Sequence, residues 1–402
     1  MRTAVQRDLP ARAAGAGDPR TLWASTSAHF LNDFYVAFLA PLLPLVVQKF
    51  NLSLALAGFL ATVLTTSAAM SQPLFGAVAD RMRRRIFVVV GPALTIAAMG
   101  LVGLAPTYPV LLMLLLLAGT GTASFHPQGA SSAGQASGAR LGRGLSLFVA
   151  GGELGYAIGP LVIALIVQSR GLAATWMVAI PGLVACVLLW RFVPSRRAVT
   201  PMPAAGGLRA DLRDAFAPLV VLWLIVVLRS IIISSYQTFI PLLLQQRGGS
   251  IVAGGWAVFL FGGIGALGGI SGGTLSDRYG RRRMLALSLI LGVPMLYAFI
   301  RTSGPLAYVF LAAGGISVYL SAAVTIVMAQ ELLPHRASVA SSIVMGLAWG
   351  TAGISLTAVG AAADMVGLEG ALTWTLTLAV VALVAIARLP ARTEPQQATA
   401  TA

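Results

Sequence analysis

The segment Gly76-Ala-Val-Ala-Asp80-Arg81-Met-Arg-Arg84-Arg85 recurs 197 residues later as Gly273-Thr-Leu-Ser-Asp277-Arg278-Tyr-Gly280-Arg281-Arg282. The same offset carries Pro44 onto Pro241. Two landmarks in one register indicate an internal repeat. The sequence therefore predicts two homologous halves, each of about the same length.

The apolar runs on either side of these segments indicate a membrane protein. The chain has 402 residues, of which 57% are hydrophobic and only 10% charged, whereas soluble proteins devote about a quarter of their residues to charged side chains. Apolar runs of 18 residues or more recur from Leu22 to Ala387, and each is long enough for a helix to cross ~30 Å of hydrocarbon. We expect an all-α integral membrane protein with twelve transmembrane helices in two pseudo-symmetric six-helix bundles.

The apolar runs also give the expected boundaries. The predicted helices cover 22–47, 52–79, 86–105, 109–131, 144–168, 172–192, 217–245, 252–276, 284–301, 305–331, 337–362 and 370–388. The predicted domains are a tail over 1–21, a bundle over 22–192, a linker over 193–216, a bundle over 217–388 and a tail over 389–402.

The distribution of basic residues predicts the orientation. With the N-terminus inside, the outer loops hold only Lys49, Arg170, Arg247 and Arg301, and Arg229 lies within a helix. All others of the 27 Lys and Arg residues are then cytoplasmic. This follows the positive-inside rule, so both termini are expected in the cytoplasm and the net charge of +15 needs no nucleic-acid partner.

The repeated segment has the form Gly-x-x-x-Asp-Arg-x-x-Arg-Arg and resembles the signature of the major facilitator superfamily. Its aspartate can pair with Arg or meet the N-terminus of a neighbouring helix, while its glycine lets a helix approach. We expect a latch that holds the cytoplasmic side closed in the outward-open state, whereas Arg83 and Arg283 are expected only to anchor the topology. The expected latch residues are Gly76, Asp80, Arg81, Arg84, Gly273, Asp277, Arg278 and Arg281.

A second segment, Gly151-Gly152-Glu153-Leu-Gly155-Tyr-Ala-Ile-Gly159-Pro160, resembles the antiporter motif of drug/proton exchangers in this superfamily. Four-residue spacing places Gly151, Gly155 and Gly159 on one helix face, which allows close helix contact. Pro160 can bend the helix. The family pattern continues with small residues, where this chain has Leu161, Val162 and Ile163.

The chain is also similar to the fosmidomycin resistance protein family. The resemblance lies in His29-Phe-Leu-Asn32-Asp33, Phe125-His126-Pro127, Ala136-Ser137-Gly138, Ile233-Ser-Ser-Tyr236 with Thr238-Phe239, and Gln330-Glu331-Leu-Leu-Pro334-x-Arg336. The acidic residue that the family has after His-Pro is Gln128 here. Because Glu153 stands where a neutral residue is expected, a proton-carrying role could have moved to it.

Three ionisable residues fall near the membrane midplane, namely Asp33, Glu153 and Arg229. An intramembrane charge costs ~2.5–3.5 kcal/mol even on the translocon scale and is functional by default. We expect all three to line one central cavity between the repeats. Asp33 could carry the proton or pair permanently with Arg229. Arg229 is expected to bind substrate or a carboxylate, because a cation that never deprotonates needs a partner.

Several other polar residues could belong to the same site. His126 could relay protons or bond a neighbouring helix, and His29 precedes Asp33 by one helical turn, so the two can pair. Asn32 lies beside them. Tyr236, Gln237 and Tyr319 could face the cavity or pack between helices.

Other functions have no support. Gly263-Ile-Gly265-Ala-Leu-Gly268 matches the dinucleotide fingerprint, but no strand precedes it. Three scattered histidines and Cys186 give no metal-ligand cluster or disulfide. We expect no cofactor and no enzyme activity.

The expected function is proton-coupled efflux of small drug-like or anionic compounds by alternating access. The family resemblance implies export of fosmidomycin, a phosphonate antibiotic, or related compounds. Uptake or exchange of an endogenous organic anion remains the alternative. The expected partners are a small-molecule substrate, protons and the lipid bilayer of the inner membrane, and we expect a monomer.

Overall fold

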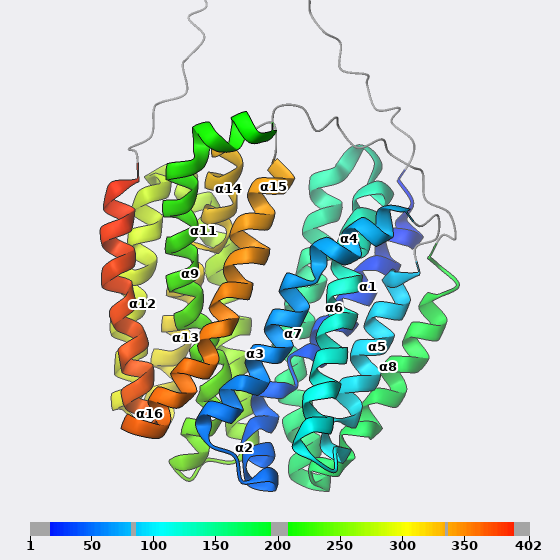
Figure 1. Cartoon of the computed structure of the whole chain (residues 1–402), viewed down its shortest axis with the longest axis vertical. Coiled ribbons are helices and arrows are strands. Elements are labelled where there is room, and N and C mark those ends of the chain that lie inside the picture. Colours follow the sequence, from blue (N-terminus) through cyan, green and yellow to red (C-terminus); the bar gives the residue numbers. More distant parts are fainter. Residues whose placement is uncertain (1–16, 82–85, 194–207, 334–336, 390–402) are drawn as a thin grey trace, which may run out of the picture.

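The computed structural model describes residues 17–81, 86–193, 208–333 and 337–389, and its helices form two groups that stand side by side (Figure 1). The first half contains α1 (Pro19–Val36), α2 (Leu39–Phe50), α3 (Leu54–Met70), α4 (Gln72–Arg81), α5 (Phe87–Leu101), α6 (Tyr108–Ala136), α7 (Leu141–Arg170) and α8 (Thr175–Leu189). The second half contains α9 (Leu208–Gln246), α10 (Ile251–Val258), α11 (Ala266–Tyr279), α12 (Arg281–Arg301), α13 (Pro305–Tyr319), α14 (Ala322–Leu332), α15 (Ala337–Ser342) and α16 (Ala348–Arg388). Short 3-10 or π turns at Val102–Leu104, Gly138–Arg140, Leu172–Ala174, Phe259–Ile264 and Ile343–Leu347 connect or bend these helices.

The helices combine into twelve membrane crossings, which confirms the predicted fold. Eleven stretches of the described chain are long and apolar enough to span a membrane, and the last, Val339–Arg388, has 50 residues. This stretch contains two helices, because Gly367 adopts φ 79° inside α16 and interrupts the helical path. A positive φ is easily reached only by glycine. The predicted seven-residue loop between the last two helices is therefore a turn centred on one residue.

Most other boundaries differ from the sequence-based ones by a few residues, and two of them have a clear physical reason. Helix α9 begins at Leu208, well before the apolar run that was predicted to start at 217, because a helix can extend beyond the hydrocarbon with polar residues in it. Helix α1 begins at Pro19, where the Asp18 carboxylate accepts hydrogen bonds from the backbone of Arg20 and Thr21. A further hydrogen bond from the Thr21 side chain lowers the pKa of Asp18.

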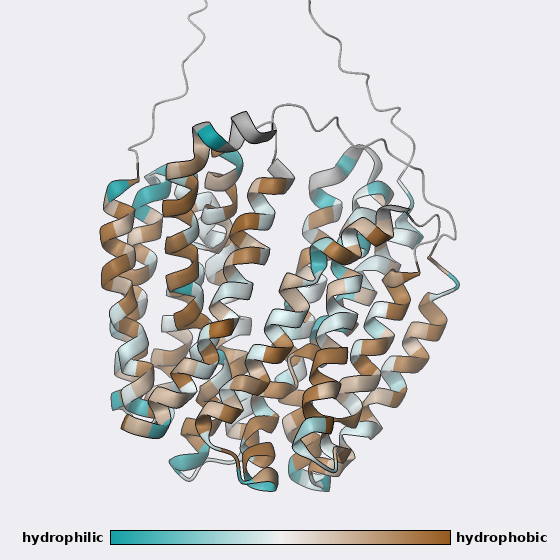
Figure 2. Ribbon diagram, in the orientation of Figure 1, coloured by the Kyte–Doolittle hydropathy of each residue, from teal (hydrophilic) through white to brown (hydrophobic). Residues whose placement is uncertain are grey.

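The outer surface of the two halves is hydrophobic. Hydrophobic residues run along the helices and hydrophilic ones gather at helix ends (Figure 2). Large apolar side chains such as Val187, Ile270 and Val380 are more than 60% exposed. A soluble protein does not expose this much contiguous apolar surface, and lipid is the solvent that covers it.

We call the side on which α1 begins and α16 ends the terminal side, and the other the opposite side (Figure 1). Toward the opposite side the halves meet where α3 contacts α16. Gly58 lies so close to the Leu356 carbonyl, and Gly360 to the Leu54 carbonyl, that a Cβ atom on either would collide. The Thr62 hydroxyl donates to the Gly353 carbonyl at 2.8 Å. Small residues thus allow the close helix contact that stabilises membrane bundles.

A carboxylate strengthens this contact at its end. Asp364 of α16 accepts hydrogen bonds from the backbone N–H groups of Leu54 (2.8 Å) and Ala55 (2.9 Å). These donors are the first residues of α3, where the helix dipole favours negative charge. Asp364 therefore caps a helix of the other half.

Helix α7 shows where the halves separate. One face of it touches the second half: Ala157 approaches Gly263, and the Gln168 side chain accepts from the Val252 backbone N–H at 3.3 Å. Toward the terminal side, Glu153 on this same face is exposed. The halves therefore part between Ala157 and Glu153, which leaves an opening toward the terminal side.

Asp364→Ala should shift the population toward the state that is open on the opposite side. Loss of a helix cap costs about 1 kcal/mol, equivalent to a roughly fivefold change in the population ratio. Electron–electron spin distances between labels at Leu104 and Leu306, one in each half, would lengthen.

Ser53→Ala is the matched control, because Ser53 caps the same helix from within its own half. It should leave the label distances unchanged. Equal distance distributions in the parent protein and Asp364→Ala would show that the cap does not hold the halves together.

Candidate functional site

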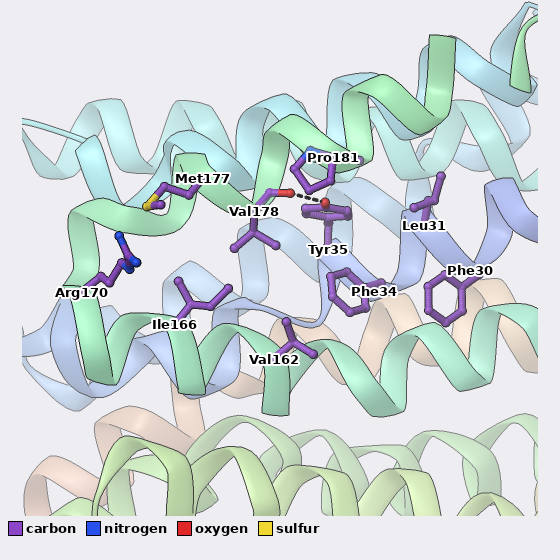
Figure 3. Close-up of a pocket in the computed structure, with 11 residues that line it drawn as sticks. Phe30, Leu31, Phe34, Tyr35, Val162, Ile166, Arg170, Met177, Val178 and Pro181 are labelled. Carbon is purple, nitrogen blue, oxygen red and sulfur yellow. Dashed lines mark hydrogen bonds between the residues drawn. The ribbon is translucent and has the colours of Figure 1, made fainter. Parts of the chain in front are cut away.

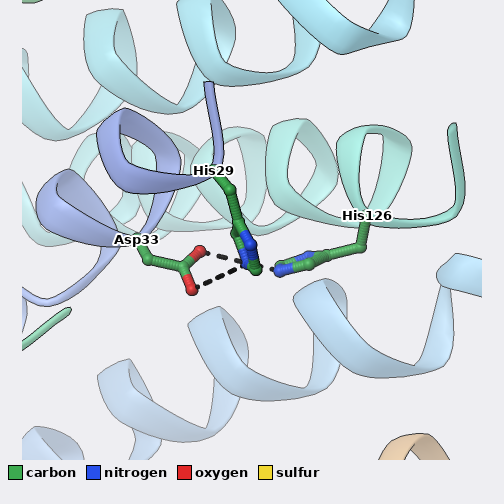
Figure 4. A group of neighbouring side chains, drawn as sticks. All are labelled: His29, Asp33 and His126. Carbon is green, nitrogen blue, oxygen red and sulfur yellow. Dashed lines mark ion pairs between the residues drawn. The ribbon is translucent and has the colours of Figure 1, made fainter. Parts of the chain in front are cut away.

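Asp33 of α1 faces two histidines that come from different helices (Figure 4). Its Oδ2 atom lies 3.2 Å from Nε2 of His29, one turn earlier on α1. Its Oδ1 atom lies 3.6 Å from Nε2 of His126 on α6. The expected pairing of His29 with Asp33 is present, and His126 joins them from another helix. We call these three residues the His–Asp–His cluster.

Backbone carbonyls fix the orientation of both rings. Nδ1 of His29 lies 2.8 Å from the Phe148 carbonyl, and Nδ1 of His126 lies 3.0 Å from the Thr122 carbonyl. Since a carbonyl oxygen only accepts, each Nδ1 carries a proton. In a neutral imidazole the Nε2 atom then carries a lone pair, which would face the lone pairs of Asp33. At least one more proton between His29 and Asp33 makes this contact attractive.

Asn32 and its partners hold the carboxylate. The Asn32 side-chain N–H donates to Asp33 at 2.8 Å, and its oxygen accepts from the hydroxyl groups of Thr95 at 3.0 Å and Thr122 at 3.4 Å. Asn32 is fully buried. Because both ends of the Asn32 amide are hydrogen-bonded, its N–H group is held pointing at the Asp33 carboxylate. This hydrogen bond favours the charged form of Asp33.

Exposure decreases from one member of the cluster to the next. The side chains of His126, Asp33 and His29 are 26%, 18% and 9% exposed, respectively. Glu153 is exposed and close enough to interact electrostatically with His29 and Asp33. A proton from the opening would therefore reach His126 and Asp33 before His29.

The cluster is the one group of three metal-type donors in the described part of the chain, with its donor atoms within 4.8 Å of one another. The histidines are thus not scattered, as the sequence suggested, because α1 and α6 bring two of them together. The cluster offers three donors, whereas closed zinc sites have four ligands.

The glycines of α7 make room for α1. Gly151, Gly155 and Gly159 lie against Thr26, Phe30 and Phe34, respectively, and any Cβ atom would collide with them. Both sets have the four-residue spacing of one helix face.

Two residues next to these glycines, Gly152 and Pro160, make contacts of their own. Gly152 lies against the ring of His29, so its missing side chain leaves space for the cluster. The buried Pro160 approaches Gly255 of the second half with its carbonyl.

Arg229 is buried in the second half, and no acidic side chain in the described part of the chain pairs with it. Its Nη1 atom donates to the Ser321 hydroxyl at 2.9 Å. Neither Asp33 nor Glu153 lies within ion-pair distance of it, so the expected pair with an acid is not formed in this structure. Its Nε atom and the hydroxyls of Ser230 and Ser234 on the same helix have no hydrogen-bond partner among the described residues.

The remaining polar candidates occupy two environments. The Gln237 side chain donates to the Tyr319 hydroxyl at 2.8 Å, and Tyr319 lies within electrostatic range of Arg229 and of Tyr156 in the other half. These two residues therefore lie near the boundary of the halves. Tyr236 is fully buried and its hydroxyl donates to the Leu296 carbonyl at 3.4 Å, so it packs within the second half.

Within the described part of the chain, the contacts of the expected latch residues Arg281 and Arg278 are with their own half. Arg281 pairs with Asp277 at 3.0 Å and with Glu331 at 2.7 Å, while Arg278 lies over the Tyr279 ring. This arrangement fits an opening on the terminal side, where the latch would be released. The side chains of Asp80 and Arg81, and all of Arg84, lie outside the described residues.

The motif glycines do not mark close helix contacts here. A Cβ atom on Gly76 would lie 3.6 Å from Pro127, and one on Gly273 would lie 3.5 Å from Ala323. Both are ordinary contacts, so the expected close approach is not seen in this conformation.

Several residues that contribute to the site could not be identified from the sequence. The Phe148 carbonyl has no side-chain signature, and Ser321 is one of many hydroxyl residues. Tyr156 could have been found, because it stands three residues after Glu153 on the same helix. Gln128 is buried and accepts from the Val88 backbone N–H at 3.3 Å, a structural bond that an amide can make.

A chain with two six-helix halves and titratable groups at an opening between them has the architecture of a secondary transporter. The family model described as the Major Facilitator Superfamily matches residues 26–358. The chain belongs to this superfamily, and it is accordingly a multi-pass membrane transporter and not an enzyme.

Two relatives match most of the chain. The uncharacterized MFS-type transporter YfnC of Bacillus subtilis (strain 168) is 30% identical over 353 residues, which cover 85% of each chain. The fosmidomycin resistance protein of Escherichia coli (strain K12) is 29% identical over 363 residues, 87% of each chain.

Solved structures share the fold at low identity. A bacterial homolog of the human lysosomal transporter Spinster, in its inward-facing and unoccupied conformation, has a TM-score of 0.74 and 17% identity, and the match covers 91% of this chain and 95% of that one. The nucleoside transporter NupG has a TM-score of 0.75 and 16% identity, with 92% and 99% covered.

Gly155→Ala should destabilise the protein by roughly 1–3 kcal/mol, the usual cost of overpacking, because its methyl group would collide with the Phe30 carbonyl. Thermal unfolding of the purified protein would show a lower Tm. Gly346→Ala is the control, since no atom lies within 4 Å of the added carbon. Equal Tm values for the two variants would contradict a close α1–α7 contact.

Proposed function

We propose that the chain exports small drug-like or anionic compounds in exchange for protons, by alternating access across the inner membrane. The observation that carries this proposal is the His–Asp–His cluster, whose outermost histidine is partly exposed near the opening between the halves. The distant relatives named for fosmidomycin resistance and multidrug resistance support export.

In the proposed orientation the terminal side faces the cytoplasm. The basic residues support it, since Lys49, Arg170, Arg247 and Arg301 belong to the opposite side and most others to the terminal side. The structure then corresponds to an inward-open state. Substrate would enter from the cytoplasm into the opening between the halves.

The proton is proposed to bind between Asp33 and the two histidines. In the outward-open state a proton enters the cluster from outside. In the inward-open state it leaves past His126, the most exposed member. Since the Nδ1 protons are held by carbonyls, exchange involves only the Nε2 atoms and the carboxylate. Glu153 would tune this exchange by its negative charge.

Arg229 is proposed to bind the anionic group of the substrate. It has one hydroxyl partner and no acidic one among the described residues, and a buried cation is stabilised by an anion. Ser230, Ser234 and Tyr319 are close enough in the sequence or the structure to add hydrogen bonds. The substrate and the proton would thus bind mainly to different halves, and closure would couple them.

The latch remains a proposal for the outward-open state. There Asp277 would exchange its bond with Arg281 for a contact with the first half, and Asp80 would do the same from the other side. In the inward-open state the ion pairs of Arg281 with Asp277 and Glu331 would neutralise the charges that take part in the latch.

Asp33→Asn should lower the rate of proton-driven transport at least tenfold, because the amide cannot take up the coupled proton. Substrate-for-substrate exchange should continue. Flux into or out of proteoliposomes with an imposed pH gradient would measure both. Glu153→Gln is the comparison and should keep most proton-driven flux. If Glu153→Gln loses coupling and Asp33→Asn keeps it, the coupling acid is Glu153.

Arg229→Gln should weaken the binding of anionic substrates roughly tenfold to a hundredfold, as expected for loss of a hydrogen bond to a charged group of about 1.5–3 kcal/mol. Titration calorimetry with a phosphonate such as fosmidomycin would measure it. Arg247→Gln, which removes a cation paired with Glu369 on the surface, is the control. Equal affinity in both variants would exclude Arg229 from the site.

Uptake or exchange of an endogenous organic anion is the second candidate. The unpaired Arg229 is compatible with it, and one relative is named a probable 4-methylmuconolactone transporter. The direction of pH-driven flux in the same proteoliposomes distinguishes the two, since export moves substrate against the inward flow of protons.

A further inference from the structure

A crevice lies within the first half (Figure 3), and no residue of the His–Asp–His cluster lines it. Its volume is about 530 Å³, and its walls come from α1, α7 and α8. Phe30, Phe34, Val162, Ile166, Met177 and Pro181 are among its lining residues. This volume lies within the usual range of ligand sites, about 300–1,000 Å³.

The crevice opens toward the bilayer and not toward the second half. Its lining residues on α7 follow a four-residue spacing, Val162, Ile166 and Arg170. Ala157, Ala164 and Gln168, which contact the second half, lie on the other face of the same helix. Figure 3 accordingly shows α7 between the crevice and the helices of the second half.

Apart from Arg170 at one end, no side chain in the described lining of the crevice has a free polar group. The one hydroxyl in its lining, that of Tyr35, donates to the Val178 carbonyl at 2.5 Å. Gly182 leaves space for this ring, since a Cβ atom there would collide with it. A ligand inside the crevice therefore gains from apolar contact and not from hydrogen bonds.

A cation stands at one end of this apolar space. Arg170 is the last residue of α7, on the opposite side of the protein, and it is exposed. Its guanidinium forms no hydrogen bond or ion pair within the described chain. An Arg side chain at a helix end lies at the level of the lipid headgroups, and its planar guanidinium matches a phosphate.

We propose that the crevice binds an acyl chain of a phospholipid from the leaflet on the opposite side, with the phosphate held by Arg170. The apolar walls, the opening toward the bilayer and the cation at headgroup level each match one part of that molecule. The site is separate from the transport opening and does not depend on the proposed substrate.

The proposal can be tested with a phosphatidylglycerol that carries a photoreactive diazirine on its acyl chain, using the full-length protein in nanodiscs. After irradiation, mass spectrometry should find labelled residues concentrated among Val162, Ile166 and Met177. Ile166→Trp, which fills the crevice, should lower this labelling at least fivefold. Leu165→Trp, which changes the neighbouring exposed residue of α7, should leave it unchanged.

The headgroup contact is tested with a second pair of variants. Arg170→Gln should lower crevice labelling by the phospholipid several-fold, whereas Arg301→Gln, on the same side but outside the crevice, should not. A diacylglycerol with the same photoreactive chain lacks the phosphate, so Arg170→Gln should not affect its labelling. Labelling spread evenly over the exposed helices, or unchanged in Ile166→Trp, would overturn the proposal.

Discussion

A charged group inside a membrane needs its partners within the protein, because hydrocarbon offers none. Asp33 meets this requirement with partners from its own helix and from α6. The positions of these partners depend on further groups. Two backbone carbonyls orient the histidines, and Gly152 leaves space for the His29 ring. The close contact of α1 with α7 therefore serves a single carboxylate as much as it serves helix packing.

The fold follows from the sequence because hydrophobic length and charge distribution act over whole helices. Twelve apolar runs and the repeat around Asp80 and Asp277 were enough to predict two six-helix halves. The predicted helices are wrong only at their ends. There the helix propensity of residues such as Leu208 and the backbone freedom of Gly367 decide the boundary. The family, too, was visible in a few short motifs.

The site was predicted less completely, for a physical reason. The sequence placed Asp33, Glu153 and Arg229 at similar depths, but the partner of a charge depends on how each helix is rotated about its axis. Their common depth suggested a pair between Asp33 and Arg229. Instead the first half gathers titratable groups around Asp33, and the second half surrounds Arg229 with hydroxyl groups. Helix rotation also brought His126 to Asp33, and no spacing along the chain could reveal this.

The contact between α3 and α16 has a consequence for the energy barrier to opening. Gly58 and Gly360 meet backbone atoms of the facing helix, so no side chain is interlocked at these two points of contact. Asp364 adds an attraction that is electrostatic and exposed to solvent, and dissolved ions weaken such attractions. The rate at which this side opens should consequently increase with the ionic strength of the medium on that side.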